Sequence, residues 1–386
     1  MFIKALVFSV VTSLAAYALA PHNKDSEVLA PLLPANKGIK VIQDSYIVVY
    51  KEDHDMEITD QSVKNGVKQL YDFGGFKGYS GKFNTETLRK IRQNPAVKYV
   101  EPDGIISIIE TVNPTTTPWN LVRISHRNRN DTSGGYIYDP KAGEGTTAYI
   151  LDSGIDIDNP EFEGRASLGA NFAQDGDNDT LGHGSHSAGV IGSKTYGVAK
   201  KAKLISVKVI NGSGLGIIVD VVGAINWAAN HAKKNNPGKS VASMPLVGGI
   251  SRSIDDAVNK AVESGLHFAV PAGNHNSDAC NYSPARAEKV ICVGATDELD
   301  RKASFSNYGS CVDIFAPGMY ITSTWSKNRT QTISGTSAAS SQVAGLIAYF
   351  LSLEQRDPTS MRSFLKAIAT KDAIPGYDFV YNNSGK

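Results

Sequence analysis

Cysteine is scarce in this chain: only Cys280, Cys292 and Cys311 occur in 386 residues. Three cysteines allow at most one internal disulfide and leave one thiol over. Charge of either sign is not in excess, since the formal net charge is +1. Such a balance gives no strong attraction to nucleic acid or anionic lipid. The sequence also has no phosphate-binding loop, no RNA-binding aromatic motif and no His-Glu-x-x-His zinc helix, so nothing predicts those functions.

Long apolar runs are equally rare. One follows Lys4, from Ala5 to Ala20, and ends in small residues. This pattern predicts a secretory signal peptide over residues 1–20, cleaved after Ala18 or Ala20. An uncleaved membrane anchor is the alternative, but the run is short for a span of about 20 residues. We therefore expect a secreted, extracellular protein with no membrane partner.

Secretion permits disulfides and N-linked glycans. Sequons also arise by chance, so each one is a candidate and no more. The candidate glycosylation sites are Asn130, Asn178, Asn211, Asn281, Asn328 and Asn382.

The first third of the chain predicts a small α+β unit. Residues 21–43 contain Pro and Gly with little periodicity, which is typical of a linker. The pattern after it predicts one strand, a helix, a hairpin, a second helix and a last strand. These elements fall at 45–50, 60–72, 73–83, 84–93 and 97–100. The order is that of a β-α-β-β-α-β unit of roughly 65 residues.

After Pro118 the pattern changes to apolar strands that alternate with helices. Continuous apolar strands separated by helices predict a parallel sheet covered on both faces. The expected strands are 147–151, 204–209, 241–244, 267–270 and 290–293, and the clearest expected helices are 219–232 and 254–264. No internal repeat is evident.

Three short glycine-containing islands carry an acid, an imidazole and a hydroxyl. Asp152 ends a buried apolar strand, and the carboxyl edge of a parallel sheet is where sites form. His183 lies between two glycines, which let the backbone bend and expose the ring. Ser337 precedes an apolar run that predicts a buried helix, so its hydroxyl lies near the positive end of the helix dipole. An imidazole that takes a serine proton, and a carboxylate that orients the imidazole, form a nucleophilic triad.

Each residue has another interpretation when taken alone. Asp152 could be a turn aspartate, His183 or His186 a surface or metal-binding histidine, and Ser337 a helix cap. The three together, in the chain order Asp, His, Ser, favour the triad, because that order is one of the known ones.

Longer segments carry a family resemblance: Pro160 to Ala166, Thr195 to Lys201, Asn281 to Ala285 and Ser304 to Ser310. With the three islands, they make the chain resemble the subtilisin-like serine proteases, specifically the secreted, fungal-type proteinase K subfamily, over about residues 118–370. The resemblance implies a doubly wound parallel sheet flanked by helices. The unit at about 45–108 resembles the family's inhibitory propeptide, a ferredoxin-like α+β domain. The implied division is a propeptide over 21–111 and a protease domain over 112–386.

The resemblance also implies residue roles. Asp152 would orient the imidazole, His183 would act as general base and then acid, and Ser337 would be the nucleophile. Asn274 matches the side-chain donor of the oxyanion hole, with a turn asparagine as the alternative. The segments that would bind substrate contain Gly212, Gly214, Leu246, Val247 and Gly248.

Two structural features are implied in the same way. Cys280 and Cys311 match a disulfide of related enzymes, while Cys292 in an apolar strand is expected to be a buried, inert thiol. Asp313, with the backbone carbonyls of Glu288 and Val290, matches a structural calcium site. The alternative is a solvated or salt-bridged aspartate. Catalysis itself would need no cofactor.

The departures from the family pattern cluster around the expected cleft. Pro245-Leu246-Val247-Gly248 stands where the family usually has Ser-Leu-Gly-Gly. Val247 puts a branched side chain where glycine leaves room, and Pro271 replaces a small residue. Gly216 occupies a position where proteinase K has a tyrosine, and Ala338 replaces the methionine after the nucleophile. We expect a narrower primary pocket that disfavours large aromatic side chains.

The predicted function is a secreted, self-processed serine endopeptidase that hydrolyses proteins through an acyl-enzyme intermediate. Its partners would be protein or peptide substrates and its own propeptide as intramolecular inhibitor, and the enzyme would be a monomer. One alternative is a weakly active or inactive relative that binds proteins through the altered cleft. Another is an enzyme of narrow specificity that processes a few substrates.

Overall fold

The computed structural model describes residues 29–35, 39–108, 111–113 and 118–385, with only the backbone described at 111–113. The predicted signal peptide at 1–20 lies outside the described residues. Within the described ranges, no helix has the length and apolar character that a membrane span requires.

The N-terminal domain is a four-stranded antiparallel sheet with two helices, ordered β2-β3-β1-β4. Its elements are β1 (Val41–Tyr50), α1 (Gln61–Gly66), β2 (Val67–Phe73), β3 (Phe76–Lys82), α2 (Thr85–Gln93) and β4 (Val97–Ser107). This is the β-α-β-β-α-β order that the sequence predicts. Asn84 caps α2, because its side chain accepts a hydrogen bond from the Thr87 N–H over 2.9 Å.

The predicted helix over 60–72 is wrong in its second half. Helix α1 ends at Gly66, and β2 begins at the next residue. Tyr71 and Phe73 are buried whereas Leu70 is 55% exposed, so burial follows a period of two. The apolar residues of this segment fit both periods, and pairing with β3 selects the strand.

The C-terminal domain is built on a nine-stranded sheet in the order β16-β17-β13-β12-β11-β10-β6-β8-β7. The strands from β13 to β7 run parallel. Its helices are α3 (Trp119–Ser125), η1 (Pro160–Phe162), α4 (His183–Gly192), α5 (Ile218–Asn235), α6 (Arg252–Glu263), η2 (Ala279–Asn281), α7 (Thr336–Leu353) and α8 (Pro358–Ile368).

Five strands of this domain, β6, β8, β10, β11 and β12, lie close to the predicted ones, and the structure adds others that the sequence did not predict. The strands of the domain within the described residues are β5 (Thr111–Asn113), β6 (Thr147–Asp152), β7 (Ala166–Asn171), β8 (Lys203–Lys208), β9 (Leu215–Ile217), β10 (Ser240–Ser243), β11 (His267–Pro271), β12 (Ile291–Thr296), β13 (Ile314–Pro317), β14 (Ile321–Trp325), β15 (Arg329–Ser334), β16 (Thr370–Ile374) and β17 (Tyr377–Phe379). Strands β14, β15 and β5 form a separate three-stranded sheet.

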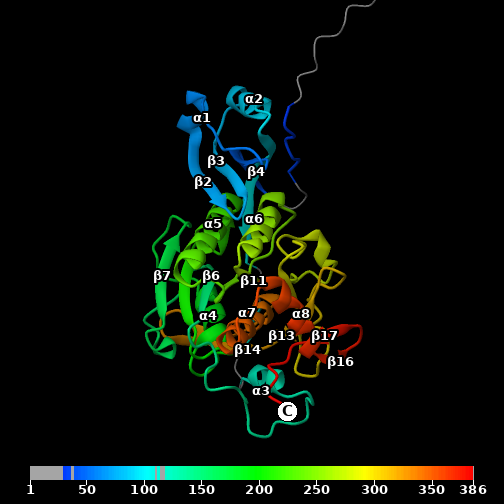
Figure 1. The fold of residues 1–386 in the computed structure, drawn as a ribbon. Helices are drawn as coiled ribbons and strands as arrows, with labels where there is room; N and C mark the ends of the chain where they lie inside the picture. Colours follow the sequence, from blue (N-terminus) through cyan, green and yellow to red (C-terminus); the bar gives the residue numbers. More distant parts are fainter. Residues whose placement is uncertain (1–28, 36–38, 109–110, 114–117, 386) are drawn as a thin grey trace, which may run out of the picture.

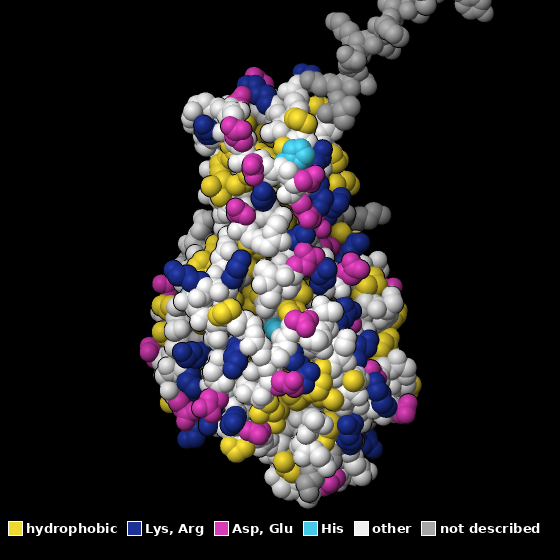
Figure 2. Space-filling model, viewed as in Figure 1, with side chains coloured by type: hydrophobic (Ala, Val, Ile, Leu, Met, Phe, Trp, Pro, Cys, Tyr) yellow, Lys and Arg dark blue, Asp and Glu magenta, His cyan; other side chains and the backbone are white. Residues whose placement is uncertain are grey.

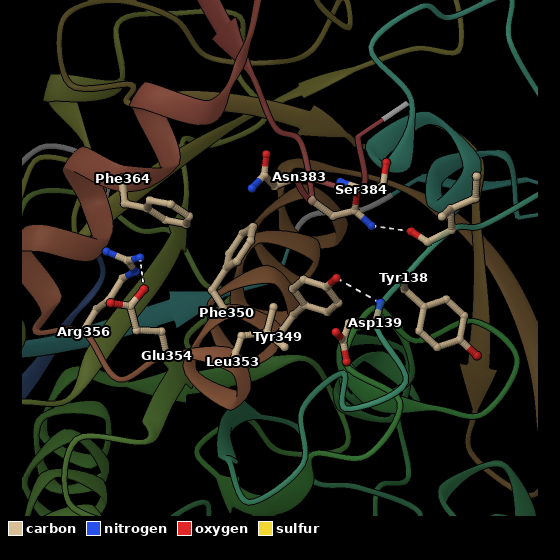
Figure 3. A pocket seen from close by; sticks show the side chains of 12 residues that line it. Tyr138, Asp139, Tyr349, Phe350, Leu353, Glu354, Arg356, Phe364, Asn383 and Ser384 are labelled. Carbon is tan, nitrogen blue, oxygen red and sulfur yellow. Dashed lines mark hydrogen bonds and ion pairs between the residues drawn. The ribbon is translucent and has the colours of Figure 1, made fainter.

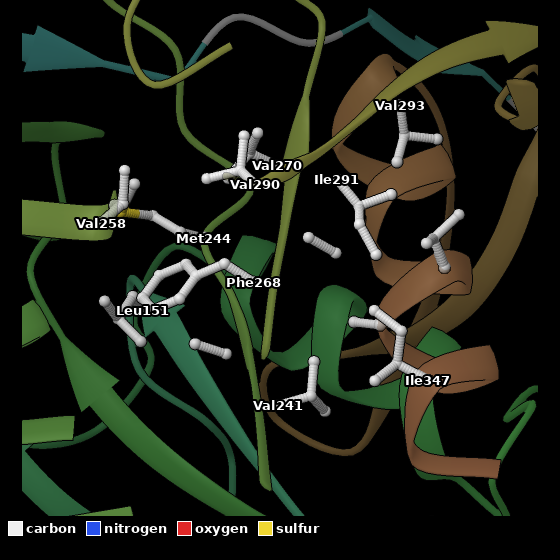
Figure 4. Packing of buried hydrophobic residues seen from close by; sticks show 14 of the residues in the cluster. Leu151, Val241, Met244, Val258, Phe268, Val270, Val290, Ile291, Val293 and Ile347 are labelled. Carbon is white, nitrogen blue, oxygen red and sulfur yellow. The ribbon is translucent and has the colours of Figure 1, made fainter. Parts of the chain in front are cut away.

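Helices cover both faces of the large sheet (Figure 1). Helices α4 and α7 pack against one face, and α5 and α6 against the other. Figure 4 shows the two resulting core layers: Val258 of α6 and Ile347 of α7 lie on opposite sides of strand residues such as Val241 and Phe268. Because both faces are covered, the central strands consist mostly of buried apolar residues, as the sequence pattern indicates.

The N-terminal domain packs across α5 and α6 and forms the narrow upper part of the molecule in Figures 1 and 2. Two of its carboxylates lie at the N-terminal ends of these helices. The Glu101 carboxylate accepts a hydrogen bond from the Ser253 N–H of α6 over 2.6 Å. The Asp103 carboxylate accepts one from the Val219 N–H of α5 over 3.1 Å. Carboxylates at helix N-termini satisfy unpaired N–H groups and complement the helix dipole. Beyond them, β4 runs down to pair with β9.

Candidate active site

Asp152 and His183 form a buried pair at the carboxyl edge of the large sheet. Asp152 is the last residue of β6, and His183 is the first residue of α4. The Nδ1 atom of His183 lies 2.6 Å from Oδ1 of Asp152, and both side chains are almost wholly inaccessible to solvent. A carboxylate at Nδ1 fixes the imidazole tautomer, so that Nε2 becomes the basic nitrogen.

Neighbouring donors hold the Asp152 carboxylate in place. The Ser153 N–H donates to its Oδ1 over 2.6 Å, and the Ser187 hydroxyl donates to its Oδ2 over 3.1 Å. Each carboxylate oxygen therefore has a donor besides the imidazole, as a buried charge requires.

Two glycines allow His183 to reach this position. Gly182 has φ of +104°, and a β-carbon there would lie 2.1 Å from the indole ring of Trp325. A β-carbon on Gly184 would lie 2.0 Å from the carbonyl oxygen of Gly154, in the loop that follows Asp152. Only glycine permits this close approach of α4 to the end of β6.

The second histidine of the island has a structural role. His186 is buried, and its Nε2 lies 2.9 Å from the carbonyl oxygen of Ile321. Burial lowers the pKa of His186 to about 3, so the ring is neutral at physiological pH. Of the two histidines, His183 is the one paired with a carboxylate.

Ser337 lies in the first turn of α7, after the extended Gly335. Its side chain is nearly buried, and its carbonyl oxygen accepts hydrogen bonds from the Ser340 and Ser341 hydroxyls, each over 2.9 Å. Helices α4 and α7 pack against each other, so His183 and Ser337 both lie in the first turns of neighbouring helices.

Asn274 lines the same small cavity as Ser337. Its Oδ1 accepts hydrogen bonds from both the backbone N–H and the hydroxyl of Thr336, over 2.9 and 2.7 Å. This contact fixes which side of the amide carries the NH2 donors. Sequence reasoning did not predict this contact, although Thr336 directly precedes Ser337.

Asp179 was missed as well. It is buried and accepts hydrogen bonds from the Ser153 hydroxyl and from the N–H groups of Gly182 and Ser185. In the sequence it is the middle residue of the Asn178 sequon. The available signal was its place four residues before His183.

The end of the N-terminal domain occupies the cleft beside Ser337. Ser107 of β4 pairs with Leu215 of β9 on one side and forms a bridge with Val247 on the other. The Ile108 N–H donates to the Gly214 carbonyl oxygen over 3.3 Å. The chain thus adds a strand between two segments of the C-terminal domain, which is how extended peptides commonly bind.

Of the five predicted substrate-binding residues, three contact this bound strand and two make other contacts. Gly214, Val247 and Gly248 contact the bound strand, the last through the Ile106 side chain. Leu246 is buried in the core, and the Gly212 N–H donates to the Asp175 carboxylate over 2.9 Å.

Farther along this strand, the side chain of Ile106 occupies a space of its own. The Ile106 side chain is buried between Gly216 and Gly248. A β-carbon at Gly216 or Gly248 would lie 3.3 or 3.1 Å from carbon atoms of Ile106. The absence of side chains at these two positions therefore makes room for a branched apolar residue.

Comparisons with known proteins identify both domains. The model of the subtilase family matches residues 143–383, and that of the peptidase inhibitor I9 family matches residues 42–108. The chain belongs to the subtilase family. Its C-terminal domain is a subtilisin-like serine protease domain, and its N-terminal domain is a propeptide inhibitor domain.

Individual relatives agree with this assignment. The subtilase is 42% identical to Subtilisin-like protease 8 of Arthroderma benhamiae, over 96% of this chain and 86% of that protein. It is also 42% identical to Alkaline protease 2 of Aspergillus fumigatus, over 89% of this chain and 81% of that protein. A crystal structure of a cold adapted subtilisin-like serine proteinase superposes with a TM-score of 0.66 at 39% identity, covering 69% of this chain and 99% of that one.

The cysteines of this subtilase lie as the family resemblance implies. Cys280 and Cys311 form a disulfide across a separation of 31 residues. Cys292 is a free, buried thiol in β12, and burial raises its pKa. A thiol that remains protonated in an apolar strand is a poor nucleophile, so Cys292 has a packing role.

Two of the three residues expected to bind calcium, Asp313 and Glu288, contact an arginine through the expected oxygens. The Arg362 guanidinium donates from Nε to Oδ1 of Asp313 over 2.8 Å, from Nη2 to the same oxygen, and from Nη1 to the Glu288 carbonyl oxygen over 2.6 Å. Oδ2 of Asp313 accepts from the Cys292 N–H. Oxygens engaged in this way do not fit a calcium ion, which needs them as ligands. The expected site of Asp313, Glu288 and Val290 is thus replaced by the salt-bridge alternative. Among the described residues, no group of three or more His, Cys, Asp or Glu could hold a metal.

One glycosylation prediction is corrected by the structure. Asn382 is buried, and its side-chain amide donates to the Ile137 carbonyl oxygen over 2.7 Å, so it cannot carry a glycan in the folded protein. Asn211 is partly buried and accepts the Ser213 N–H. The other four sequon asparagines, Asn130, Asn178, Asn281 and Asn328, are exposed.

A separate hollow of about 460 Å³ lies at the C-terminal end of α7 (Figure 3). Tyr349, Phe350 and Leu353 of that helix line it, and Phe364 and the Glu354–Arg356 ion pair lie at one end. Because Ser337 is at the other end of α7, this hollow is not part of the candidate active site.

Proposed function

We propose that this subtilase is a secreted serine endopeptidase that hydrolyses peptide bonds in proteins through Asp152, His183 and Ser337. The observation that carries the proposal is the buried pair of Asp152 with His183 of α4, which packs against α7, together with the cavity that Ser337 of α7 and Asn274 line with the chain's own strand. A serine, a base, an orienting acid and an oxyanion donor are the parts that acyl transfer requires.

The geometry suggests a role for each group. His183 Nε2 takes the Ser337 hydroxyl proton while the oxygen bonds to the peptide carbonyl carbon, and Asp152 stabilises the imidazolium. The same proton then passes to the leaving amine as the C–N bond breaks, which leaves an acyl-enzyme. Water, activated by His183, hydrolyses the acyl-enzyme. The Asn274 amide would donate to the oxyanion, an interaction typically worth about 3–4 kcal/mol of barrier. This mechanism uses no cofactor.

Self-processing follows from the path of the chain. Ile108 contacts Gly214 on one side of the cleft, while Thr111 pairs with Ser334, shortly before the nucleophile. We propose that the enzyme cuts its own chain close to Thr111, which separates a propeptide over 21–111 from a protease domain over 112–386. The inhibitor domain then remains in the cleft as an intramolecular inhibitor until it is released.

Secretion is supported by the apolar N-terminal run at 1–20 and by the disulfide. We propose glycans at the exposed sequons Asn130, Asn178, Asn281 and Asn328, and Asn211 as a less accessible candidate. The mature enzyme would act as an extracellular monomer.

The cleft suggests a restricted specificity. A Val247 methyl lies 3.4 Å from the place a β-carbon would take on Gly273, so Val247 faces Gly273. Pro245 and Pro271 line the same cavity, whose volume is about 20 Å³ in the unprocessed chain, where Ser107 and Ile108 of the bound strand also line it. We propose that small or medium apolar side chains are accepted before the scissile bond, and that branched apolar residues are favoured in the Ile106 subsite.

The second candidate function is that of a weakly active or inactive relative that binds proteins through its cleft. The observation that favours it is the Val247 side chain, which faces Gly273 in this cavity and narrows the space for a substrate side chain. A third candidate, processing of a few substrates, differs from the first only in the number of sequences cleaved.

Secreted expression of wild type and Ser337→Ala, compared by mass, tests the proposal. We expect wild type to lose residues up to about Thr111 and Ser337→Ala to retain them. A serine-directed covalent reagent should label processed wild type and not the variant. Wild type that stays unprocessed and unlabelled, but binds peptides, would establish the binding-protein alternative instead.

A further inference from the structure

Asp179 connects the segment that carries the acid to the segment that carries the base. Its Oδ1 accepts hydrogen bonds from the Ser153 hydroxyl over 2.9 Å and from the Gly182 N–H over 2.7 Å. Its Oδ2 accepts the N–H and the hydroxyl of Ser185 over 2.8 and 2.7 Å. Ser153 follows Asp152 directly, whereas Gly182 and Ser185 lie on either side of His183–Gly184.

The Ser153 hydroxyl extends this connection. It donates to Asp179 and accepts the Gly184 N–H over 2.9 Å. The first turn of α4 is therefore held against the end of β6 from two sides. No intrahelical partner exists for the first N–H groups of a helix, so Asp179 also supplies the cap that α4 lacks at Gly182.

We propose that Asp179 is a positioning residue for catalysis, which sets the distance between Asp152 and His183. It does not touch the reacting atoms but acts through the two triad members. This role exists only if the proposed function holds. A second carboxylate near the triad also adds negative charge beside the imidazole, which favours its protonated form during the reaction.

Burial is costly for this carboxylate. Burial raises the pKa of Asp179, and the nearby charge of Asp152 raises it further, while its hydrogen bonds act in the opposite direction. This buried carboxylate is costly to the fold, yet its hydrogen bonds link the two segments that carry Asp152 and His183. We therefore infer that it positions these segments and does not only stabilise the fold.

Asp179→Asn tests the role, because an amide cannot accept from all these donors. The asparagine NH2 group would replace one of the two carboxylate oxygens and would face a backbone N–H group of the α4 segment, which is also a donor. We expect kcat to fall about 100-fold, as small misplacements of catalytic groups can do, with KM within about twofold of wild type. The acid limb of the kcat/KM pH profile should move to lower pH, because a negative charge near His183 is lost.

Two comparisons separate positioning from folding. Asp177→Asn is the matched control, since Asp177 is an exposed carboxylate of the same loop that bonds to Asn171. It should leave kcat and the pH profile unchanged. In a Ser337→Ala background the chain cannot process itself, so thermal melting with and without the Asp179→Asn substitution compares stability directly.

The outcomes are distinct. If Asp179→Asn is folded, processed and equal to wild type in kcat and pH profile, the positioning role is overturned. If it lowers only the melting temperature, Asp179 has a structural role and the inference fails. If wild type itself is inactive and unlabelled, the proposed function has failed instead.

A second inference comes from Arg362, which lies on α8 and contacts Asp313 and Glu288 as described above. The guanidinium brings a permanent positive charge to the oxygens that the resemblance assigns to calcium. Asp313 is almost buried beside β13, so its charge needs a partner.

We infer that Arg362 takes the place of a calcium ion at this position and makes this part of the fold independent of calcium. The fixed cation joins α8 to the starts of β12 and β13 through Glu288 and Asp313. Ion binding would make the same connection only at sufficient calcium concentration.

Removal of the guanidinium should make the site calcium-dependent. In the full-length Ser337→Ala chain, we expect Arg362→Ala to lower the melting temperature, and added calcium to raise it again. Calcium should not rescue Arg362→Ala/Asp313→Asn, which lacks the carboxylate. The parent chain, which keeps Arg362, should show no calcium response that depends on Asp313.

The comparison is between variants, so calcium bound elsewhere does not affect it. If Arg362→Ala melts at the same temperature as its parent, the inference is overturned. It is equally overturned if the parent and Arg362→Ala are stabilised by calcium to the same extent. A larger response in Arg362→Ala supports it.

Discussion

Thr336 donates two hydrogen bonds to Oδ1 of Asn274, one from its backbone N–H and one from its hydroxyl. The residue before the proposed nucleophile thus orients the proposed oxyanion donor. The same hydroxyl accepts the Gly273 N–H over 3.1 Å. The helix that carries Ser337 and the loop that carries Asn274 are therefore tied together at the point where the reaction would occur.

Substitution of this pair should affect turnover more than binding. We expect Asn274→Ala to lower kcat about 100- to 1,000-fold, since one oxyanion donor is lost. Thr336→Val should have a smaller effect of the same kind, because the backbone N–H still contacts Asn274. Steady-state kinetics on a peptide substrate measure both. A change confined to KM in Asn274→Ala would contradict the assignment.

Enlargement of the primary pocket should change specificity. Val247→Gly removes the side chain that faces Gly273, so large aromatic residues before the scissile bond should become acceptable. We expect kcat/KM for Phe relative to Ala at that position to rise about 10-fold or more. Peptide-library cleavage checks this, with Val241→Ala, a core change outside the cavity, as the control. Strong cleavage after Phe or Tyr by wild type would show that Val247 does not restrict the pocket.

Stability of the unprocessed chain should fall as pH rises. Burial raises the pKa of Asp220 and Asp255, in the first turns of α5 and α6, to about 7. Groups whose pKa is raised on folding contribute stability that is present below their ordinary pKa and lost as pH rises through the folded pKa.

We therefore expect the melting temperature of the Ser337→Ala chain to fall between about pH 4 and pH 7, at about 2–4 °C per kcal/mol, and to level off above that range. Asp220→Asn and Asp255→Asn should flatten this dependence. A melting temperature that rises over this range by the same amount in all three chains would refute the role of these two carboxylates.

Loss of the disulfide should destabilise the protease domain. Closing a loop of 31 residues contributes roughly 3–4 kcal/mol in the chain-entropy model. Cys280→Ser/Cys311→Ser should melt well below wild type, whereas Cys292→Ala should change the melting temperature much less. Melting under reducing conditions provides a second measurement. The melting temperature of wild type should fall toward that of the double variant, and that of the double variant should not change.

Asn382 should carry no glycan. Peptide mass analysis with and without an endoglycosidase should find it unmodified. Asn382→Ala leaves the Ile137 carbonyl oxygen without this donor and should cost about 1–3 kcal/mol of stability. Asn383→Ala keeps the sequon and changes only an exposed neighbour, so it should have little effect. A glycan on Asn382 in folded protein would mean that this region opens.

The structure also shows where sequence periodicity fails. Residues 67–73 have apolar side chains at spacings that suit a helix and a strand, and only pairing with β3 decides between them. By contrast, β6, β11 and β12 consist mostly of apolar residues and are buried along their whole length, so composition was enough to predict them.

The sequence by itself predicted the chemistry of the candidate site, because Asp152, His183 and Ser337 occur together among glycines in the chain order Asp, His, Ser. It also predicted the order of the elements in the N-terminal domain. Tertiary structure decided which other residues support that chemistry. Asp179 meets Ser153, Thr336 meets Asn274, and Asp313 meets Arg362, across separations of 26, 62 and 49 residues. Such contacts depend on how distant segments pack, and no local pattern records them.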